Sequence, residues 1–494
     1  MKFTVKDVDI SSGGVLVAIL NKRDAQKLDI HNLDRIKVIK GDRVETAVVD
    51  IATGRTVKPG HIGLFEEMLS SLHVKNKDSV HIMLARKPLS LDFIKKKLDG
   101  KKLNAREIDQ IVWDITHNKL SDTELTYFVS ACYTNLMDFN ETIMLTKSIV
   151  AHGTTLKLRK YPIIDKHSIG GVPGNRTTML IVPIIAAAGL YIPKTSSRSI
   201  TSPAGTADTM EVLAPVSFAV EKMRKIVEKT KGCIVWGGAL NLAPADDKII
   251  KVEKPLSIDA ESQLLASIMA KKLSVGSTHI LIDIPIGKGS KIEKPYRALK
   301  LKREFEAIAR RLKRKINVVI TDGSQPIGRG IGPALEARDV LDVLSNNDGA
   351  EDLRKKSVHM AGLILEMAGK ARKGQGEKLA AEILESGKAY EKMREIIKAQ
   401  GGNTTSSSRI KVGKHRYGFR AYKSGRVTNV DPLHISRIAR IAGAPTDKGA
   451  GIYLHYKRGD KVKKSDTLFT IHAENSEKLK FAVEALQKDV VVIR

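Results

Sequence analysis

Cysteine is almost absent from the sequence, and this limits the chemistry that the chain can carry. Its two cysteines, Cys132 and Cys233, lie far apart and match no metal-binding or redox spacing. So few thiols are typical of a protein of the reducing cytoplasm, and the first residues do not predict a signal peptide. We therefore expect a cytoplasmic protein with no metal site.

Long apolar runs are missing as well. The longest one, residues 180–192, is interrupted by Pro183 and is shorter than the roughly 20 residues that a membrane span needs. The apolar content of 42% is nevertheless ordinary for a globular protein. The sequence thus predicts a soluble chain with no membrane partner, and 494 residues suffice for several domains.

Aromatic residues make up only 4% of the chain, and this bears on its formal net charge of +29. An excess of Lys and Arg can indicate nucleic-acid binding, but the sequence has no stacking motif or zinc knuckle, and the charge is dispersed. The same field would attract a small anionic substrate, and 28% charged residues suit a heat-adapted protein. We expect a small anion as the ligand and no nucleic acid, with a basic nucleic-acid-binding protein as the alternative.

The distribution of apolar runs predicts a multidomain α/β protein. A β-rich module (1–85) precedes a helical domain (86–160), in which Asn104, Ser121 and Asn140 are expected to start helices. Between 161 and 335, buried-strand signals alternate with glycine loops and helices, which is typical of a mixed or largely parallel sheet. A helical segment with a flexible connector (336–408) and an α+β module (409–494) complete the chain.

The first segment with chemical character is the glycine loop at 166–177, KHSIGGVPGNRT. Glycines let a backbone approach an anion, and the helix that follows directs unpaired N–H groups at it. Lys166 adds charge, while Ser168 and Thr177 carry hydroxyl groups. The loop matches neither a Walker A loop nor a dinucleotide fingerprint, so it predicts an anion site of another kind or, alternatively, a simple turn.

Three later segments have similar character. The loop at 196–206, SSRSITSPAGT, predicts a second phosphate site or a solvated turn. In the segment 259–271, Ser267 and Lys271 share one helix face, while Asp259 stands where the helix should begin, as a general acid or as a cap. The glycine loop at 286–291 offers two lysines to phosphate or to solvent.

In chain order, these segments resemble the thymidine and pyrimidine nucleoside phosphorylase family. The KHS-x-GG loop of that family matches residues 166–171, and its AS-I-x-x-KK helix matches 266–272. Its T-D-x-x-Q-P-x-G and G-x-A-L-E signatures match 321–328 and 332–336. The similarity covers roughly residues 88–494. It implies a phosphate-dependent pentosyltransferase that uses no cofactor and assembles at least as a homodimer.

The resemblance also implies roles for single residues. The expected phosphate-binding residues are Lys166, His167, Ser168, Thr177, Ser196 and Thr206, with His167 beside the scissile bond. The expected contacts to the rest of the substrate are Gly171, Ser197, Arg198, Ser199, Ile200, Thr201, Ser202, Thr206 and Lys291, with Ser267 and Lys271 facing the base.

One departure from the family pattern is informative. The arginine that contacts the pyrimidine lies fifteen residues before the serine of the AS-I motif, and Val252 occupies that position here. Together with the hydroxyl-rich segment 197–206 and the APADD segment 243–247, this resembles the archaeal nucleoside-monophosphate branch of the family. In that branch the aspartate that opens the helix is the acid, which is Asp259 here.

The branch implies phosphorolysis of nucleoside 5′-monophosphates, AMP and also CMP and UMP, to free base and ribose 1,5-bisphosphate. Phosphate would attack C1′ while Asp259 protonates the departing base. The enzymatic alternatives are a pyrimidine nucleoside phosphorylase acting on unphosphorylated nucleosides and an anthranilate-type phosphoribosyltransferase. The missing glycine and metal-carboxylate motifs argue against the latter. The extra N-terminal module is expected to drive assembly beyond a dimer.

Overall fold

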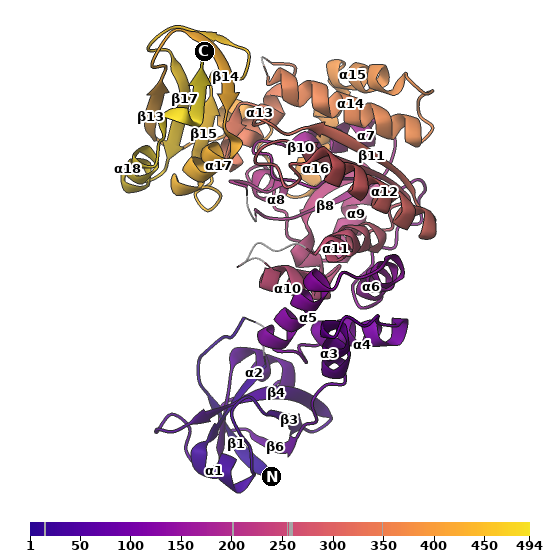
Figure 1. The fold of residues 1–494 in the computed structure, drawn as a ribbon, viewed down its shortest axis with the longest axis vertical. Helices are drawn as coiled ribbons and strands as arrows, with labels where there is room; N and C mark the ends of the chain where they lie inside the picture. The colour runs from indigo at the N-terminus through magenta and orange to yellow at the C-terminus, as the bar shows by residue number, and fades with distance from the viewer. Residues whose placement is uncertain (14–15, 200–201, 254, 256–259, 348) are drawn as a thin grey trace. The chain divides into compact units, whose positions relative to one another are not determined.

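The computed structural model describes residues 1–13, 16–199, 202–253, 255, 260–347 and 349–494. The described chain divides into two units, one made of residues 1–152 with 244–267 and the other of 153–243 with 268–494 (Figure 1). Each unit has its own buried apolar core. Within the described ranges, no helix has the length and apolar character of a membrane span.

The first unit begins with a closed barrel of six strands. Its strands are β1 (Lys2–Asp7), β2 (Val17–Asn21), β3 (Arg35–Lys40), β4 (Arg43–Ala52), β5 (His61–Leu64) and β6 (Ser79–Leu84), with α1 (Lys22–Lys27) and α2 (Glu66–Leu72) in the connections. Buried side chains alternate along the strands, as Phe3 and Val5 do in β1. Closure leaves no unpaired edge, which makes the expected β-rich module a self-contained barrel.

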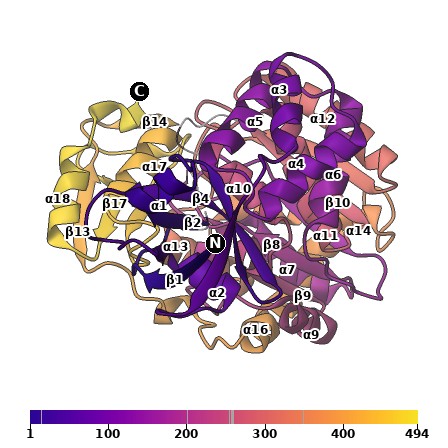
Figure 2. The same cartoon turned by 90° about the horizontal axis from the view of Figure 1, so that it is seen from below.

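A helical bundle follows in the same unit (Figure 2). It contains α3 (Ser90–Leu98), α4 (Ala105–Thr116), α5 (Asp122–Thr134), α6 (Phe139–Ala151) and α10 (Pro244–Glu253). The capping boxes predicted at Asn104 and Ser121 are confirmed. The start predicted at Asn140 is wrong, because the side chain of Asp138 accepts from the N–H of Glu141 and begins the helix two residues earlier.

The second unit contains the parallel sheet that the sequence predicts. Its strands are β7 (Ile164–Ser168), β8 (Ile192–Ser196), β9 (Gly232–Trp236), β10 (His279–Ile286) and β11 (Lys315–Asp322). They pair in parallel as β11-β10-β7 and as β8-β9, and a parallel bridge between Ile163 and Tyr191 joins the two sets. The loops that follow these strands therefore leave from one edge of the sheet, where α/β proteins bind ligands.

Helices cover the faces of this sheet. The buried helix α7 (Thr177–Ala187) packs against α14 (Glu351–Met367) and α16 (Lys388–Ala399), while α12 (Pro295–Arg311) packs on β11 (Figure 1). Further helices of the unit are α8 (Thr206–Met210), α9 (Val220–Thr230), α13 (Pro333–Leu344) and α15 (Gly376–Glu385). The helix α11 (Glu261–Ser274) runs from the first unit into the second.

The C-terminal module is α+β, as predicted. It contains β13 (His415–Arg420), β14 (Gly425–Val430), β15 (Gly451–Leu454), β16 (Lys461–Val462), β17 (Thr467–Ala473), β18 (Val491–Ile493), α17 (Pro432–Ile441) and α18 (Ser476–Glu484), and β12 (Gly330–Ile331) extends its larger sheet. The connector expected to be flexible is instead anchored at its start. There the buried amide of Gln400 bonds to both backbone groups of Ile234 and to the carbonyl of Pro215.

Candidate functional site

The glycine loop 166–177 joins the end of β7 to the start of α7. Gly170 and Gly171 have φ of 97° and 93°, which non-glycine residues rarely adopt. At Gly174, a Cβ atom would lie 2.0 Å from the carbonyl oxygen of Ile327, so only glycine allows this close approach. The loop is thus shaped by its glycines, and its hydroxyl residues Ser168 and Thr177 stand at its two ends.

Beneath the loop, the carboxylate of Asp165 is buried among cations. Its Oδ2 lies 2.9 Å from Lys272 Nζ, and its Oδ1 lies 3.9 Å from Lys194 Nζ. Oδ1 also accepts from the backbone N–H of Lys166 at 2.7 Å. Asp165 therefore joins β7 to β8 and to the C-terminal part of α11, the helix that carries Lys271 beside Lys272.

A second buried carboxylate, Asp283 of β10, lies beside the first turn of the loop. It accepts from the hydroxyl of Ser168 at 2.9 Å and from that of Thr321 at 2.5 Å, and Lys356 Nζ lies 3.4 Å away. Burial alone would raise the pKa of Asp283. Lys356 and Lys166 together with the two hydroxyl groups outweigh burial and hold this pKa below its ordinary value, so the carboxyl is ionised.

The charges around the loop do not cancel. Basic side chains outnumber acidic ones by two in this cluster, which contains Lys166, Arg176, Lys194, Lys272 and Lys356 against Asp165, Asp283 and Glu336. Burial and then the neighbouring cations lower the pKa of Lys166 to about 8 and that of Lys194 to about 7. An anion bound beside the cluster would offset this excess of basic groups.

His167 lies half-buried in the same loop. Burial, followed by the charges of Lys272, Lys194, Lys166 and Lys271, holds its pKa well below the ordinary value. The imidazole is therefore neutral at pH 7, and it can offer a hydrogen bond to a substrate without adding charge.

The loop 196–206 is organised differently. Arg198 pairs with Glu211 at 2.6 Å and with Asp208 at 3.2 Å, and its guanidinium lies 4.9 Å from the ring centre of Trp236. Asp208 also accepts from the backbone N–H of Ser199 and of Gly205, which closes the loop on itself. The positive charge of Arg198 is thus balanced within the loop and α8.

The hydroxyl groups of this segment are mostly engaged at the protein's own backbone. Ser196 ends β8 and donates to the carbonyl of Val235 at 3.2 Å, and Ser202 donates to that of Ala204 at 2.7 Å. Ser199 donates to the carbonyl of Ser202. Ser197 is exposed at the start of the loop. Ile200 and Thr201, two of the predicted contacts, lie outside the described residues.

Arg176 connects the two loops. Its Nε donates to the buried carboxylate of Glu336 at the start of α13, and its Nη1 donates to the hydroxyl of Thr206 at 3.0 Å. Its Nη2 donates to the carbonyl of Ala204 at 2.6 Å. Burial raises the pKa of Glu336, and Arg176 opposes that shift. The structure therefore links Thr206 to the first loop through the guanidinium of Arg176, the residue that precedes Thr177.

The glycine loop 286–291 approaches the glycine loop 166–177 through its backbone. A Cβ atom on Gly171 would lie 2.4 Å from the backbone nitrogen of Lys291, so only glycine at this position allows the two loops to approach so closely. Lys291 is exposed beside this contact, while Lys288 lies 3.6 Å from Asp431 at the start of α17. The two lysines of this loop thus face different surroundings.

The remaining predicted residues lie on or before α11. Ser267 and Lys271 are one turn apart on this helix and are both half-buried. Val252 lies in the last turn of α10. Asp259, the predicted acid, lies outside the described residues. The roles of Asp259, Ser267 and Lys271 therefore stay predictions.

Several residues of the cluster were not predicted, although some left a signal in the sequence. Asp283 interrupts an apolar strand and Asp165 directly follows an apolar run, and a charge in a buried strand needs a partner. The sequence marks Arg176 only as one residue of the glycine loop 166–177. Lys356, on α14, has no comparable sequence signal.

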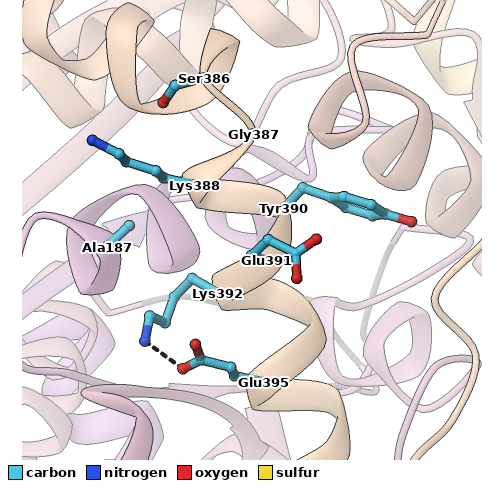
Figure 3. Close-up of a pocket in the computed structure, with 8 residues that line it drawn as sticks. All are labelled: Ala187, Ser386, Gly387, Lys388, Tyr390, Glu391, Lys392 and Glu395. Carbon is cyan, nitrogen blue, oxygen red and sulfur yellow. Dashed lines mark hydrogen bonds and ion pairs between the residues drawn. The ribbon is translucent and has the colours of Figure 1, made fainter.

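No group of three or more His, Cys, Asp or Glu side chains suited to a metal ion occurs within the described ranges. A surface depression lined by Ala187 and residues 386–395 lies beside α16 (Figure 3). Ala187 ends α7, ten residues or about 15 Å along the helix from Thr177. The depression is therefore separate from the loops and from the candidate site.

Three family models match the chain. The helical bundle domain of a glycosyl transferase family matches residues 91–153, the a/b domain of that family matches 160–390, and the pyrimidine nucleoside phosphorylase C-terminal domain matches 426–492. The matches cover the parallel sheet and the loops 166–177, 196–206 and 286–291, but not the N-terminal barrel.

Curated relatives match almost the whole chain, including the barrel. The AMP phosphorylase of Pyrococcus furiosus is 49% identical over 98% of this chain and 96% of its own length. That of Thermococcus kodakarensis is 48% identical over the same shares. AMP phosphorylase 1 of Archaeoglobus fulgidus is 47% identical over 100% of this chain and 97% of its own length.

Among solved structures, anthranilate phosphoribosyltransferase from Thermus thermophilus has a similar fold. Its TM-score is 0.54 at 18% identity, with 63% of this chain and 100% of that chain covered. At this identity, the likeness concerns the fold alone.

Proposed function

The chain belongs to the family of AMP phosphorylases, and we propose that it cleaves nucleoside 5′-monophosphates with inorganic phosphate. The products are the free base and ribose 1,5-bisphosphate, with AMP as a substrate and CMP and UMP as further ones. The observation that carries this proposal is the identity of 47–49% to three such enzymes over at least 98% of the chain. No metal or cofactor takes part in the proposed reaction.

In this proposal, inorganic phosphate binds at the loop 166–177, where the buried cluster has its excess positive charge. Lys166, Ser168, Thr177 and Ser196 form the phosphate site, and the neutral imidazole of His167 lies beside the bond that breaks. One phosphate oxygen attacks C1′ while the bond from C1′ to the base nitrogen breaks, and its electron pair leaves with the base. Asp259 donates a proton to that nitrogen, which makes the base a better leaving group.

The nucleotide is held by the second loop together with Gly171, Lys291, Ser267 and Lys271. Arg198 already balances two carboxylates, and taking up a second anion would require it to leave them. We therefore assign the 5′-phosphate to Lys291, while residues 197–206 shape the site around the ribose. Ser267 and Lys271 would face the base.

The test is to incubate the protein with AMP, CMP and UMP, each with and without phosphate, and to measure base release by chromatography. We expect release only with phosphate, with ribose 1,5-bisphosphate as the second product. The matched controls are adenosine, uridine and thymidine. If these nucleosides are cleaved as fast as the monophosphates, the enzyme is a pyrimidine nucleoside phosphorylase and the proposal is wrong.

The acid is tested by Asp259→Asn. An amide cannot supply the proton, so we expect kcat for AMP to fall by about 100-fold or more while thermal unfolding is unchanged. An equal loss of stability would instead indicate that Asp259 caps α11.

We also propose that the protein is a homodimer or a larger homo-oligomer and that the N-terminal barrel promotes the larger form. Deleting residues 1–84 and measuring the mass by light scattering tests this. A smaller assembly is expected, and an unchanged number of subunits would exclude a role for the barrel.

A further inference from the structure

The hydroxyl of Ser168 has one proton, and the structure shows which group receives it. Ser168 Oγ lies 2.9 Å from Oδ2 of the buried Asp283. Although burial opposes ionisation, Lys356 and Lys166 hold the pKa of Asp283 below its ordinary value. An ionised carboxylate only accepts hydrogen bonds, so Ser168 must be the donor.

The other polar groups of the loop continue this hydrogen-bond chain in one direction. Lys166 Nζ donates to Thr177 Oγ1 at 2.9 Å, and Thr177 donates to Asn175 Oδ1 at 3.1 Å. The amide nitrogen of Asn175 then lies 3.4 Å from Ser168 Oγ as its donor. If the Asn175 amide were flipped, its oxygen would face the oxygen of Ser168, whose only proton is already donated to Asp283. Asp283 therefore fixes the direction of the whole chain.

We propose that Asp283 makes Ser168 a hydrogen-bond acceptor in the phosphate site, so that the site selects an oxyanion carrying its own proton. A serine oxygen has two lone pairs, and Asn175 occupies one of them. The other is available to the P–OH group of inorganic phosphate, which keeps at least one proton near neutral pH. Sulfate keeps none, and its oxygen would face a lone pair. This inference rests on the proposed function, because it concerns the same phosphate site.

Attraction and selection are thereby carried by different groups. The excess positive charge around Lys166 attracts phosphate and sulfate alike, whereas Ser168 distinguishes them by their protons. Thr206 differs from Ser168 in being a donor: its oxygen accepts a hydrogen bond from Arg176, and its own proton is left to donate. A phosphate whose protonated oxygen faces Ser168 also presents its unprotonated oxygens elsewhere, and only these are good nucleophiles. Asp283 is thus a positioning residue.

The decisive experiment measures the dissociation constants of inorganic phosphate and sulfate by calorimetry at pH 7 on the full chain. The wild type should bind phosphate more tightly than sulfate. In Ser168→Ala, phosphate binding should weaken by about tenfold, as expected for one hydrogen bond to a charged group, while sulfate binding stays equal or tightens. If both anions weaken by the same factor, Ser168 is a donor and the inference is wrong.

The matched control is Thr321→Val, which removes the other hydroxyl on Asp283 and leaves that of Ser168. It should leave the ratio of the two dissociation constants unchanged. The double variant Asp283→Leu/Lys356→Met removes the acceptor together with Lys356, which lies 3.4 Å from it, so the net charge of the cluster is unchanged. It returns the Ser168 proton to the site, so sulfate should gain about tenfold relative to phosphate. An unchanged ratio in a folded double variant would overturn the inference, and Ser168→Ala decides if that variant does not fold.

Base release from AMP is recorded separately, so the two hypotheses can fail independently. If no base is released but the anion selectivity follows Ser168, the proposed reaction is wrong and the acceptor role stands. If base is released but both anions weaken equally in Ser168→Ala, the reaction stands and the acceptor role is wrong.

Discussion

The two loops that meet at Arg176 differ in how their charges are balanced. Around the loop 166–177, basic side chains outnumber carboxylates by two, and burial and then neighbouring cations lower the pKa of Lys166 to about 8. In the loop 196–206, Arg198 and Lys448 face Asp208 and Glu211, and the charges cancel. The first loop is therefore poised to bind an anion, while the second is already closed by its own pairs.

This difference suggests a division of labour. A buried charge excess costs stability until an anion arrives, so the first loop favours tight binding of free phosphate. A balanced, half-exposed loop gains little from a further anion, but it can define the shape of the nucleotide site. Arg176 is shared by both loops, and changes to it should have the largest effect.

Arg176→Met removes the hydrogen bonds that link the two loops and leaves the buried carboxylate of Glu336 without its cation. Removing one partner of a buried pair typically costs about 3–5 kcal/mol of unfolding free energy. We expect a loss in this range by denaturant unfolding. The control, Arg176→Met/Glu336→Leu, should recover most of the stability but not the affinity for phosphate, because Thr206 is no longer held. If both the stability and the affinity for phosphate recovered, the link that Arg176 makes between the loops would be only structural.

Lys166→Met tests the charge excess itself. Removing this cation from the proposed phosphate site should raise KM for phosphate by about tenfold or more, as expected for the loss of one hydrogen bond to a charged group. Stability in the absence of phosphate should change little, because the variant loses the attraction between Lys166 and Asp283 but also relieves repulsion from Lys356, Arg176 and Lys272. Denaturation and steady-state kinetics on the same sample check both. A large loss of stability would mean that the excess charge does not strain the fold.

The limits of sequence-based prediction follow from the same comparison. The residues 166–171 predicted an anion site because glycines and hydroxyls are visible as a local pattern. The groups that tune the site could not be predicted, because their partners are remote in sequence: Ser168 and Asp283 lie 115 positions apart, and Arg176 and Glu336 lie 160 positions apart. The parallel sheet was predictable from alternating strands and helices. The pairing of Arg198 with Glu211, which changes its expected role, depends on how α8 folds back beside the loop.

The pH dependence of stability should have the same sign in the two loops but lie in different pH ranges. The folded pKa of Lys166, about 8, lies below its ordinary value of 10.5, so the unfolded chain binds more protons between these values. Stability from this group therefore rises with pH from about 8 to 10.5, by roughly 3 kcal/mol. Unfolding of the wild type compared with Lys166→Met at pH 7.5 and 10 isolates the effect. Saturating phosphate should abolish the rise, because bound phosphate keeps Lys166 protonated.

Glu211 changes stability in the same direction, but in an acidic pH range. Hydrogen bonds and charge from Arg198 and Lys448 outweigh burial and lower its pKa from 4.5 to about 2. Its contribution is therefore present above pH 4.5 and is lost as the pH falls toward 2.

The smallest expected effect is that of Glu211→Gln at pH 7. This pair is partly exposed, so its removal should cost less than about 1 kcal/mol of stability. The difference from the wild type should vanish near pH 2. Because Asp208 still pairs with Arg198, we expect KM for AMP to change by less than about threefold. Lys291→Met is the matched comparison, and it should raise KM for AMP by about tenfold without changing KM for phosphate. A marked fall in KM for AMP in Glu211→Gln would instead show that freed Arg198 binds the 5′-phosphate, and the division of labour between the loops would then be wrong.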